Sequence, residues 1–120
     1  MNRRVVASVS DMLFASKIRG TAEQLGVTVN FARNAGALFD AAKTEVPDLF
    51  IFDLHATHPD PFALAARLKA DERLRAVPIV GFFSHVQTEL QTRATEAGVD
   101  KVLPRSVFTK RLPEILKGEF

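Results

Sequence analysis

Asp53 is the carboxylate that the hydrophobic pattern places at the end of a buried strand, because it closes an apolar run over residues 49–52. A carboxylate in that position can accept a phosphoryl group, contribute to a metal site, or accept hydrogen bonds from backbone N–H groups. Arg105 follows another short apolar run, so its guanidinium could pair with a bound phosphate or with Asp53 itself. The plainer interpretation is a strand-end carboxylate capped by backbone N–H groups or paired with Arg105.

The three histidines, His55, His58 and His85, follow the same apolar run or the next one along the chain. Imidazole nitrogens together with one carboxylate are ligands for Zn²⁺ or another transition metal, and the lack of cysteine does not exclude such a site. The alternative is three solvated loop histidines, which would give this surface a pH-dependent charge.

The elements that must position these residues alternate along the chain. Strands are indicated by runs rich in β-branched and aromatic residues, over residues 5–9, 27–31, 48–53, 77–83 and 101–103. Helices are indicated by apolar residues at helical spacing, over residues 12–25, 35–43, 62–70, 88–97 and 107–116. Pro113 lies inside the last of these segments, where it predicts a kink or a late first turn.

This alternation predicts one α/β domain over residues 1–120, with a doubly wound, flavodoxin-like parallel sheet of five strands in the order 2-1-3-4-5. Helices should cover both faces of the sheet and form a three-layer sandwich. Ligands of such sheets bind outside the carboxyl ends of the strands, and Asp53 is predicted at one of those ends. The sequence has no glycine-rich phosphate loop, Ser/His/Asp spacing or nucleotide fingerprint, so we do not expect an enzyme.

The composition narrows the range of partners. The 16 basic and 14 acidic side chains give a formal net charge of +2, and the basic residues are dispersed, so direct nucleic-acid binding is not expected. No apolar run approaches the roughly 20 residues of a membrane span, and polar residues interrupt the N-terminal segment before it reaches signal-peptide length. The sequence therefore predicts a cytoplasmic protein without membrane contact.

Four segments together resemble a response-regulator receiver domain: residues 47–55, 60–71, 77–80 and 97–105. They share with that family the order of elements and the spacing of proline, glycine and aspartate, over nearly the whole chain. The resemblance implies that Asp53 corresponds to the phosphorylated aspartate of the family. It also implies a role in two-component signal transduction or a phosphorelay, with a kinase, a phosphotransfer protein or an effector protein as partner.

The metal-binding position departs from the family pattern. Receivers hold Mg²⁺ with two adjacent acids after the first strand, where this chain has Ser8, Val9 and Ser10, with only Asp11 nearby. Mg²⁺ needs near-octahedral oxygen ligation, which Asp53 alone does not supply, so no cofactor is expected. Asp11 would restore some metal affinity if its side chain turned inward; otherwise Asp11 or Ser10 caps the helix that follows.

Three further positions depart as well. The small hydroxyl that ends the fourth strand of receivers corresponds here to Phe83, with Ser84 one residue later. Ser84 would donate a hydrogen bond to an anion or to nearby backbone. The aromatic switch residue of the fifth strand corresponds to Val102, and the lysine after it corresponds to Arg105, whose planar fork is directed differently from an ammonium group.

These departures favour an atypical receiver, or pseudo-receiver, that acts through protein–protein interaction and has a degenerate phosphorylation site. The alternative is a phosphorylatable receiver, in which Asp53 accepts a phosphoryl group from a histidine kinase or phosphotransfer protein. In that alternative Asp11 and Arg105 are partial substitutes for the family residues, and Mg²⁺ is the cofactor.

The pattern does not readily bury three phenylalanines, Phe83, Phe108 and Phe120. If they are exposed together with Val102 and Leu103, they form an apolar patch around the fourth helix, fifth strand and fifth helix. Receivers commonly use this surface for partners, and it is a candidate homodimer contact. The alternative is that one or more of these rings fill the vacated phosphate pocket.

Overall fold

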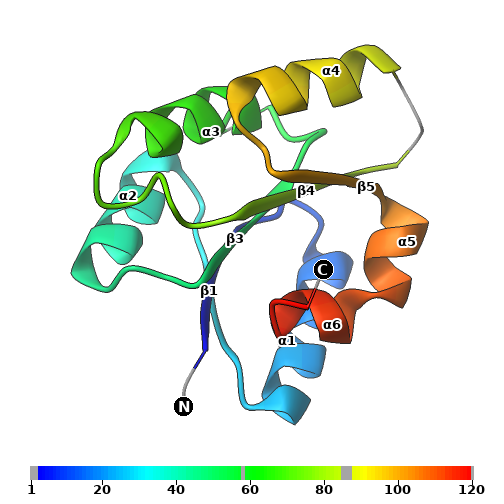
Figure 1. Ribbon diagram of the computed structural model, residues 1–120. Coiled ribbons are helices and arrows are strands. Elements are labelled where there is room, and N and C mark those ends of the chain that lie inside the picture. The colour runs from blue at the N-terminus through cyan, green and yellow to red at the C-terminus, as the bar shows by residue number, and fades with distance from the viewer. Residues whose placement is uncertain (1–2, 58, 85–87, 120) are drawn as a thin grey trace.

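The computed structural model describes residues 3–57, 59–84 and 88–119, in which five parallel strands form one sheet between two layers of helices (Figure 1). The strands are β1 (Arg4–Ser8), β2 (Thr28–Phe31), β3 (Leu49–Asp53), β4 (Ile79–Phe83) and β5 (Lys101–Pro104). The helices are α1 (Met12–Leu25), α2 (Ala35–Thr44), α3 (Pro61–Ala70), α4 (Thr88–Ala97), α5 (Arg105–Lys110) and α6 (Leu112–Leu116).

The strand order is β2-β1-β3-β4-β5, which confirms the predicted doubly wound topology. Every residue of β3 and of β4 is buried, as expected for parallel strands covered on both faces. The register pairs Ser8 of β1 with Phe52 of β3, and Asp53 with Phe82 of β4. Asp53 therefore lies at the carboxyl edge of the sheet, beside the boundary between β1 and β3 where the strand order reverses.

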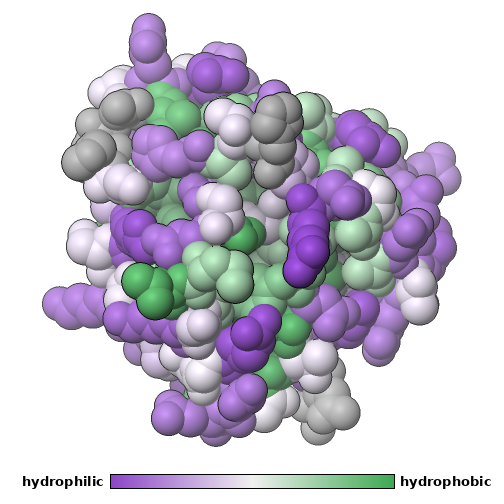
Figure 2. All heavy atoms as spheres, turned by 180° about the vertical axis from the view of Figure 1, so that it is seen from behind, coloured by the Kyte–Doolittle hydropathy of each residue, from purple (hydrophilic) through white to green (hydrophobic). Residues whose placement is uncertain are grey.

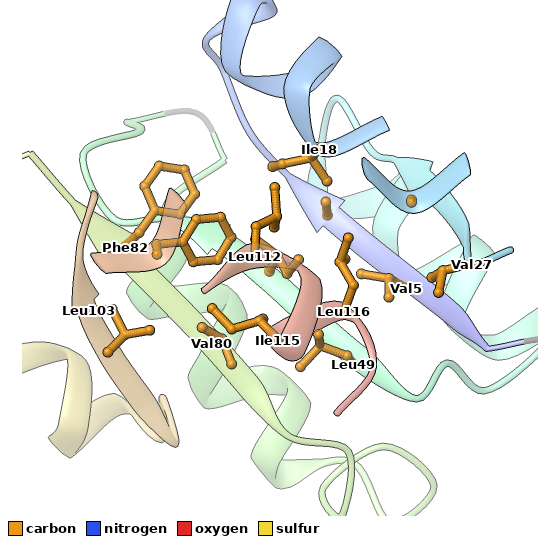
Figure 3. Close-up of a cluster of buried hydrophobic side chains, with 14 of the residues drawn as sticks. Val5, Ile18, Val27, Leu49, Val80, Phe82, Leu103, Leu112, Ile115 and Leu116 are labelled. Carbon is orange, nitrogen blue, oxygen red and sulfur yellow. The ribbon is translucent and has the colours of Figure 1, made fainter. Parts of the chain in front are cut away.

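One hydrophobic core, here called the first core, lies between the sheet and α1, α5 and α6. Figure 3 shows side chains of these helices directed at the strands, among them Ile18, Leu112, Ile115 and Leu116. Three aromatic rings meet in this core: the Phe82 ring centroid lies 4.7 Å from that of Phe14 and 4.8 Å from that of Phe108. These rings connect β4 to the first and fifth helices.

The second core lies on the opposite face, between the sheet and α2, α3 and α4. Phe50 and Phe52 alternate with Leu49 and Ile51 along β3, so they point to this second face while the other two point to the first. Gly81 of β4 has no side chain to fill the space beside Leu54; a Cβ built there would lie 2.9 Å from that leucine.

Short polar side chains define where three helices begin. Asp11, Asn34 and Asp60 precede α1, α2 and α3, and each accepts at least one hydrogen bond from a backbone N–H group in the first turn. Gly26 ends α1 in the left-handed conformation, with a φ of 72°. Local hydrogen bonds therefore determine where the loops at the carboxyl edge end and these helices begin.

The C-terminal segment corrects the prediction of one helix over residues 107–116. The structure has two short helices there, α5 and α6, which meet at Arg111. Pro113 lies in the first turn of α6, where its missing N–H does not remove a helical hydrogen bond that the turn requires. The late-first-turn alternative for this proline is thus confirmed.

The longest helix, α1, has 14 residues, and across the described ranges no helix combines the length and apolar character that a bilayer crossing requires. On the face seen in Figure 2, hydrophilic side chains surround separate areas of hydrophobic surface. Met12 and Leu13, at the start of α1, are the most exposed large hydrophobic residues of the described chain, at 81% and 85%.

Candidate functional site

Asp53, the last residue of β3, is only 8% exposed. The Ser10 hydroxyl donates a hydrogen bond to its Oδ2 at 3.0 Å, and the His55 N–H donates to its Oδ1 at 3.0 Å. Each carboxylate oxygen therefore has a donor, as a buried charge requires. The backbone-capped interpretation of Asp53 is confirmed, with the Ser10 hydroxyl as an additional partner.

Arg105 pairs with Asp11, which differs from the alternative in which it pairs with Asp53. Its Nη2 donates to Asp11 Oδ2 at 2.7 Å, and its guanidinium carbon lies 4.3 Å from the centre of the Phe14 ring. The other oxygen of Asp11 accepts the N–H groups of Leu13 and Phe14 at the start of α1. Asp11 thus caps the helix, and its carboxylate does not turn inward toward Asp53.

The hydrogen bond from Arg105 lowers the pKa of Asp11 below its ordinary value of 3.8, and the Phe14 N–H lowers it further. Because the carboxyl pKa is lower in the folded state, the pair stabilises the fold above the ordinary carboxyl range. This stabilisation is lost as the pH falls through the lowered value. Both side chains are more than a third exposed, at 39% for Asp11 and 38% for Arg105, so solvent screens the pair.

Replacing Asp11 with asparagine should remove the pair and keep the cap, because both residues are good N-caps. We expect wild type to be more stable than the variant at pH 7, with a difference that shrinks as the pH falls below 3.8. Urea unfolding midpoints at several pH values measure this difference. A difference that does not vary with pH would contradict the role of the charge, and Asp11→Ala would add the loss of the cap.

Ser8, the last residue of β1, and the two residues after it offer Asp53 no acidic partner for a Mg²⁺ site. Ser8 is buried, Val9 is half-buried, and Ser10 already donates its hydroxyl to Asp53. None of the three carries a carboxylate, and Asp11 is held by Arg105 and the helix N-terminus. One buried carboxylate with both oxygens already hydrogen-bonded does not match the oxygen-rich octahedral ligation that Mg²⁺ requires.

Of the three histidines considered as metal ligands, His55 lies among the described residues, and it is exposed. His58 and His85 lie outside the described residues. Within residues 3–57, 59–84 and 88–119 there is no cluster of three or more histidine or acidic side chains arranged to hold a metal ion. A transition-metal site at this edge stays a prediction.

The predicted apolar patch is not formed by the residues that the structure describes. Phe83, Leu103 and Phe108 are 2%, 8% and 0% exposed, and Val102 is half-buried against the second core. Phe120 lies outside the described residues. Phe83 is buried because β4 is covered on both faces, whereas Leu103 and Phe108 are buried because their side chains lie in the first core. The homodimer contact stays a prediction.

Phe83, at the position of the small hydroxyl of receivers, belongs to the second core with Leu64, Leu68 and Ala94. Ser84, the next residue, is exposed, and no described residue is hydrogen-bonded to its hydroxyl. Asp53, Ser10 and Arg105 lie at the carboxyl edge of the sheet, where the sequence places them.

A groove beside Asp53 was not predicted from the sequence. It has a volume of about 420 Å³ and is lined by Ser8, Ser10, Arg19 and Arg33, among other residues. Its two arginines belong to no motif. The only signal for them in the sequence is that Arg33 follows the second strand and that Arg19 lies two helical turns after the first helix begins.

No family model matches the sequence, and neither does any curated protein. The fold matches many solved structures. A putative response regulator from Chloroflexus aurantiacus matches with a TM-score of 0.87 at 17% identity, over 99% of this chain and 98% of that chain. The chemotaxis response regulator CheY4 of Vibrio cholerae matches with a TM-score of 0.85 at 15% identity, over 100% of both chains.

The signal receiver domain of a histidine kinase from Syntrophus aciditrophicus matches with a TM-score of 0.79 at 21% identity, over 97% of this chain and 91% of that chain. At such identities the likeness establishes the fold. The chain therefore has the five-stranded, flavodoxin-like fold of receiver domains, as the sequence predicts.

Proposed function

We propose that this chain is an atypical receiver domain, which acts in cytoplasmic signal transduction through protein–protein interaction and has a degenerate phosphorylation site. The observation that carries the proposal is the environment of Asp53. Its two oxygens accept hydrogen bonds from the Ser10 hydroxyl and the His55 N–H at 3.0 Å each, and neither donor carries a positive charge. Asp53 then serves to hold the ends of β1 and β3 together.

Phosphoryl transfer to Asp53 would lack its usual electrostatic support. The reaction depends on cancelling charge on the equatorial oxygens of the transferred group, which metal ions and cationic side chains normally do. Ser10 and Val9 bring no carboxylate for a metal. Arg105 would have to leave Asp11, 2.7 Å away, to reach a phosphoryl group on Asp53.

The switch positions support the same proposal. In place of a hydroxyl and a mobile ring the chain has Phe83, packed in the second core, and Val102, half-buried beside it. A buried phenylalanine cannot donate a hydrogen bond to a phosphoryl oxygen. The domain would therefore keep one conformation, or change it when a kinase, phosphotransfer or effector protein binds.

The second candidate is a receiver in which Asp53 itself accepts a phosphoryl group. One observation favours it: Asp53 lies at the carboxyl edge of the sheet, beside the strand-order reversal, in the position where doubly wound folds bind ligands. In this reaction a carboxylate oxygen of Asp53 attacks phosphorus, an acyl phosphate forms, and the bond from phosphorus to the donor breaks. The Ser10 hydroxyl donates a hydrogen bond to Oδ2 and therefore lowers the nucleophilicity of that oxygen.

Incubation with acetyl phosphate and Mg²⁺, followed by intact mass spectrometry, separates the two candidates. We expect wild type to show no phosphoryl adduct under conditions that fully label a receiver with an intact acid pair. Asp53→Asn and Asp48→Asn serve as matched variants, because both remove one aspartate at an end of β3. A labile adduct that Asp53→Asn abolishes and Asp48→Asn retains would establish the second candidate instead.

A further inference from the structure

The groove beside Asp53 has the size and lining of a small-molecule site. Its volume of about 420 Å³ lies within the range of about 300–1,000 Å³ that is common for ligand pockets. Met12, Phe31 and Pro59 contribute apolar surface from α1, β2 and the loop before α3. Elements distant in sequence thus build the groove together at the carboxyl edge of the sheet.

Ser8 provides a buried polar group with unused hydrogen-bonding capacity. It is 4% exposed and is one of two buried polar residues in the described chain, the other being Asp53. Asp53 has its donors, whereas no described residue is hydrogen-bonded to the Ser8 hydroxyl. Every fully enclosed side-chain nitrogen or oxygen of the described residues has a partner, so the unpartnered Ser8 hydroxyl is not fully enclosed, and Ser8 is one of the residues that line the groove.

Arg19 and Arg33 give the groove its positive charge. The guanidinium carbon of Arg19 lies 4.9 Å from the centre of the Phe31 ring, a contact that holds the cation at the wall of the groove. No ion pair within the described ranges includes Arg19 or Arg33. Both cations are therefore available to an anion.

The two acidic side chains near the groove, Asp53 and Asp11, already have a hydrogen-bond or ion-pair partner. Asp53 receives its hydrogen bond from Ser10, which also lines the groove, and Asp11 is paired with Arg105. An anionic group in the groove would avoid Asp53 and approach the two arginines. The groove also has an apolar lining, so the best occupant has an apolar body as well as a charge.

We propose that this groove binds a small amphipathic organic anion. Its carboxylate pairs with Arg19 and Arg33, and its apolar body lies along Met12, Phe31 and Pro59. The Ser8 hydroxyl donates a hydrogen bond to a polar substituent or accepts one from it. The binding does not depend on the signalling role proposed above, nor on phosphorylation of Asp53.

Fluorescence titration with 2-naphthoate tests the proposal directly. The chain has no Trp and no Tyr, so the naphthalene ring can be excited without protein background. We expect saturable binding with a Kd of about 1 mM or tighter, the range for a ligand of this size. The neutral isostere 2-naphthamide should bind about tenfold more weakly, because it lacks the charge that the arginines recognise.

Variants locate the binding. The double variant Arg19→Gln/Arg33→Gln should weaken 2-naphthoate binding about tenfold or more, whereas Arg75→Gln, an exposed arginine in the loop before β4, should leave it unchanged. Ser16→Phe places a bulky ring on the exposed rim of the groove and should abolish binding. Circular dichroism establishes that each variant is folded.

Three outcomes would overturn the proposal. The first is no saturable binding of 2-naphthoate at millimolar concentration to the folded wild-type protein. The second is equal affinity for the acid and the amide, or an affinity that the double variant retains. The third is an affinity for inorganic phosphate, measured by competition, that equals the affinity for 2-naphthoate. A site for simple anions would make no use of the apolar walls.

Discussion

Replacing Phe108 with alanine is expected to lower the free energy of unfolding by about 3–5 kcal/mol, the usual cost of removing a buried phenylalanine side chain. Phe108 is 0% exposed, and its ring centroid lies 4.8 Å from that of Phe82 and 5.7 Å from that of Phe14. Alanine would leave a cavity between α1, β4 and α5. Since domains are stable by only about 5–15 kcal/mol, this is a large share of the total.

The effect should be large for a second reason. Helix α5 has six residues, and a helix of that length is not stable in water without tertiary contacts. Phe108 is its one buried residue, so the variant loses the contact that holds α5 against the sheet. Urea unfolding followed by circular dichroism measures the loss.

Phe62→Ala is the matched control. Phe62 lies on α3, is half-buried, and has the Arg93 guanidinium 4.3 Å above its ring. We expect a loss of about 1 kcal/mol, near the average for point mutations. Equal losses for the two variants would contradict the central place of Phe108 in the first core.

Replacing Ser10 with aspartate is expected to destabilise the protein by about 1 kcal/mol at neutral pH and to make its stability depend on Mg²⁺. The Ser10 hydroxyl lies 3.0 Å from Asp53 Oδ2, so the variant replaces a donor with a second carboxylate beside a buried charge. Repulsion between the two carboxylates lowers stability. A divalent cation that binds both would restore it.

The size of the Mg²⁺ effect follows from binding linkage. A site with a Kd of about 1 mM gains about 1.4 kcal/mol at about 10 mM Mg²⁺, because the cation binds the folded state alone. Thermal unfolding of Ser10→Asp with and without Mg²⁺ measures this gain. Ser10→Asn, the neutral isostere, should show neither the loss at neutral pH nor the Mg²⁺ response. The same response in both variants would contradict the view that Ser10 closes the Asp53 site to a metal.

Hydrophobic periodicity predicts the order of elements correctly because the central strands β1, β3 and β4 are buried almost throughout and each long helix buries one face. It places three strand starts too early, at residues 27, 48 and 77, where the structure begins β2 at Thr28, β3 at Leu49 and β4 at Ile79. Val27 and Val77 are buried, but their N–H groups donate to Ala22 O and Leu74 O, so they belong to turns that precede β2 and β4. Burial alone does not distinguish a strand residue from an apolar turn residue.

Which residues gather at the carboxyl edge is also predictable, because parallel strands all end on the same side of the sheet. Which of these side chains pair with one another is not predictable from the sequence. Arg105 and Asp11 are 94 positions apart, and whether the guanidinium reaches Asp11 or Asp53 depends on side-chain rotamers and on the Phe14 ring beneath it. The groove with Arg19 and Arg33 eludes sequence reasoning for the same reason.

The ring cluster of Phe14, Phe82 and Phe108 can form only after the C-terminal part of the chain has left the ribosome. A growing chain leaves the ribosome N-terminus first, so α1 is released long before α5 and α6, which complete the first core. Until residues 105–116 emerge, one apolar face of β3 and β4 has no cover from these two helices. Because long-range parallel pairing is slow and exposed apolar strands favour aggregation, we expect this interval to be the most aggregation-prone stage of synthesis.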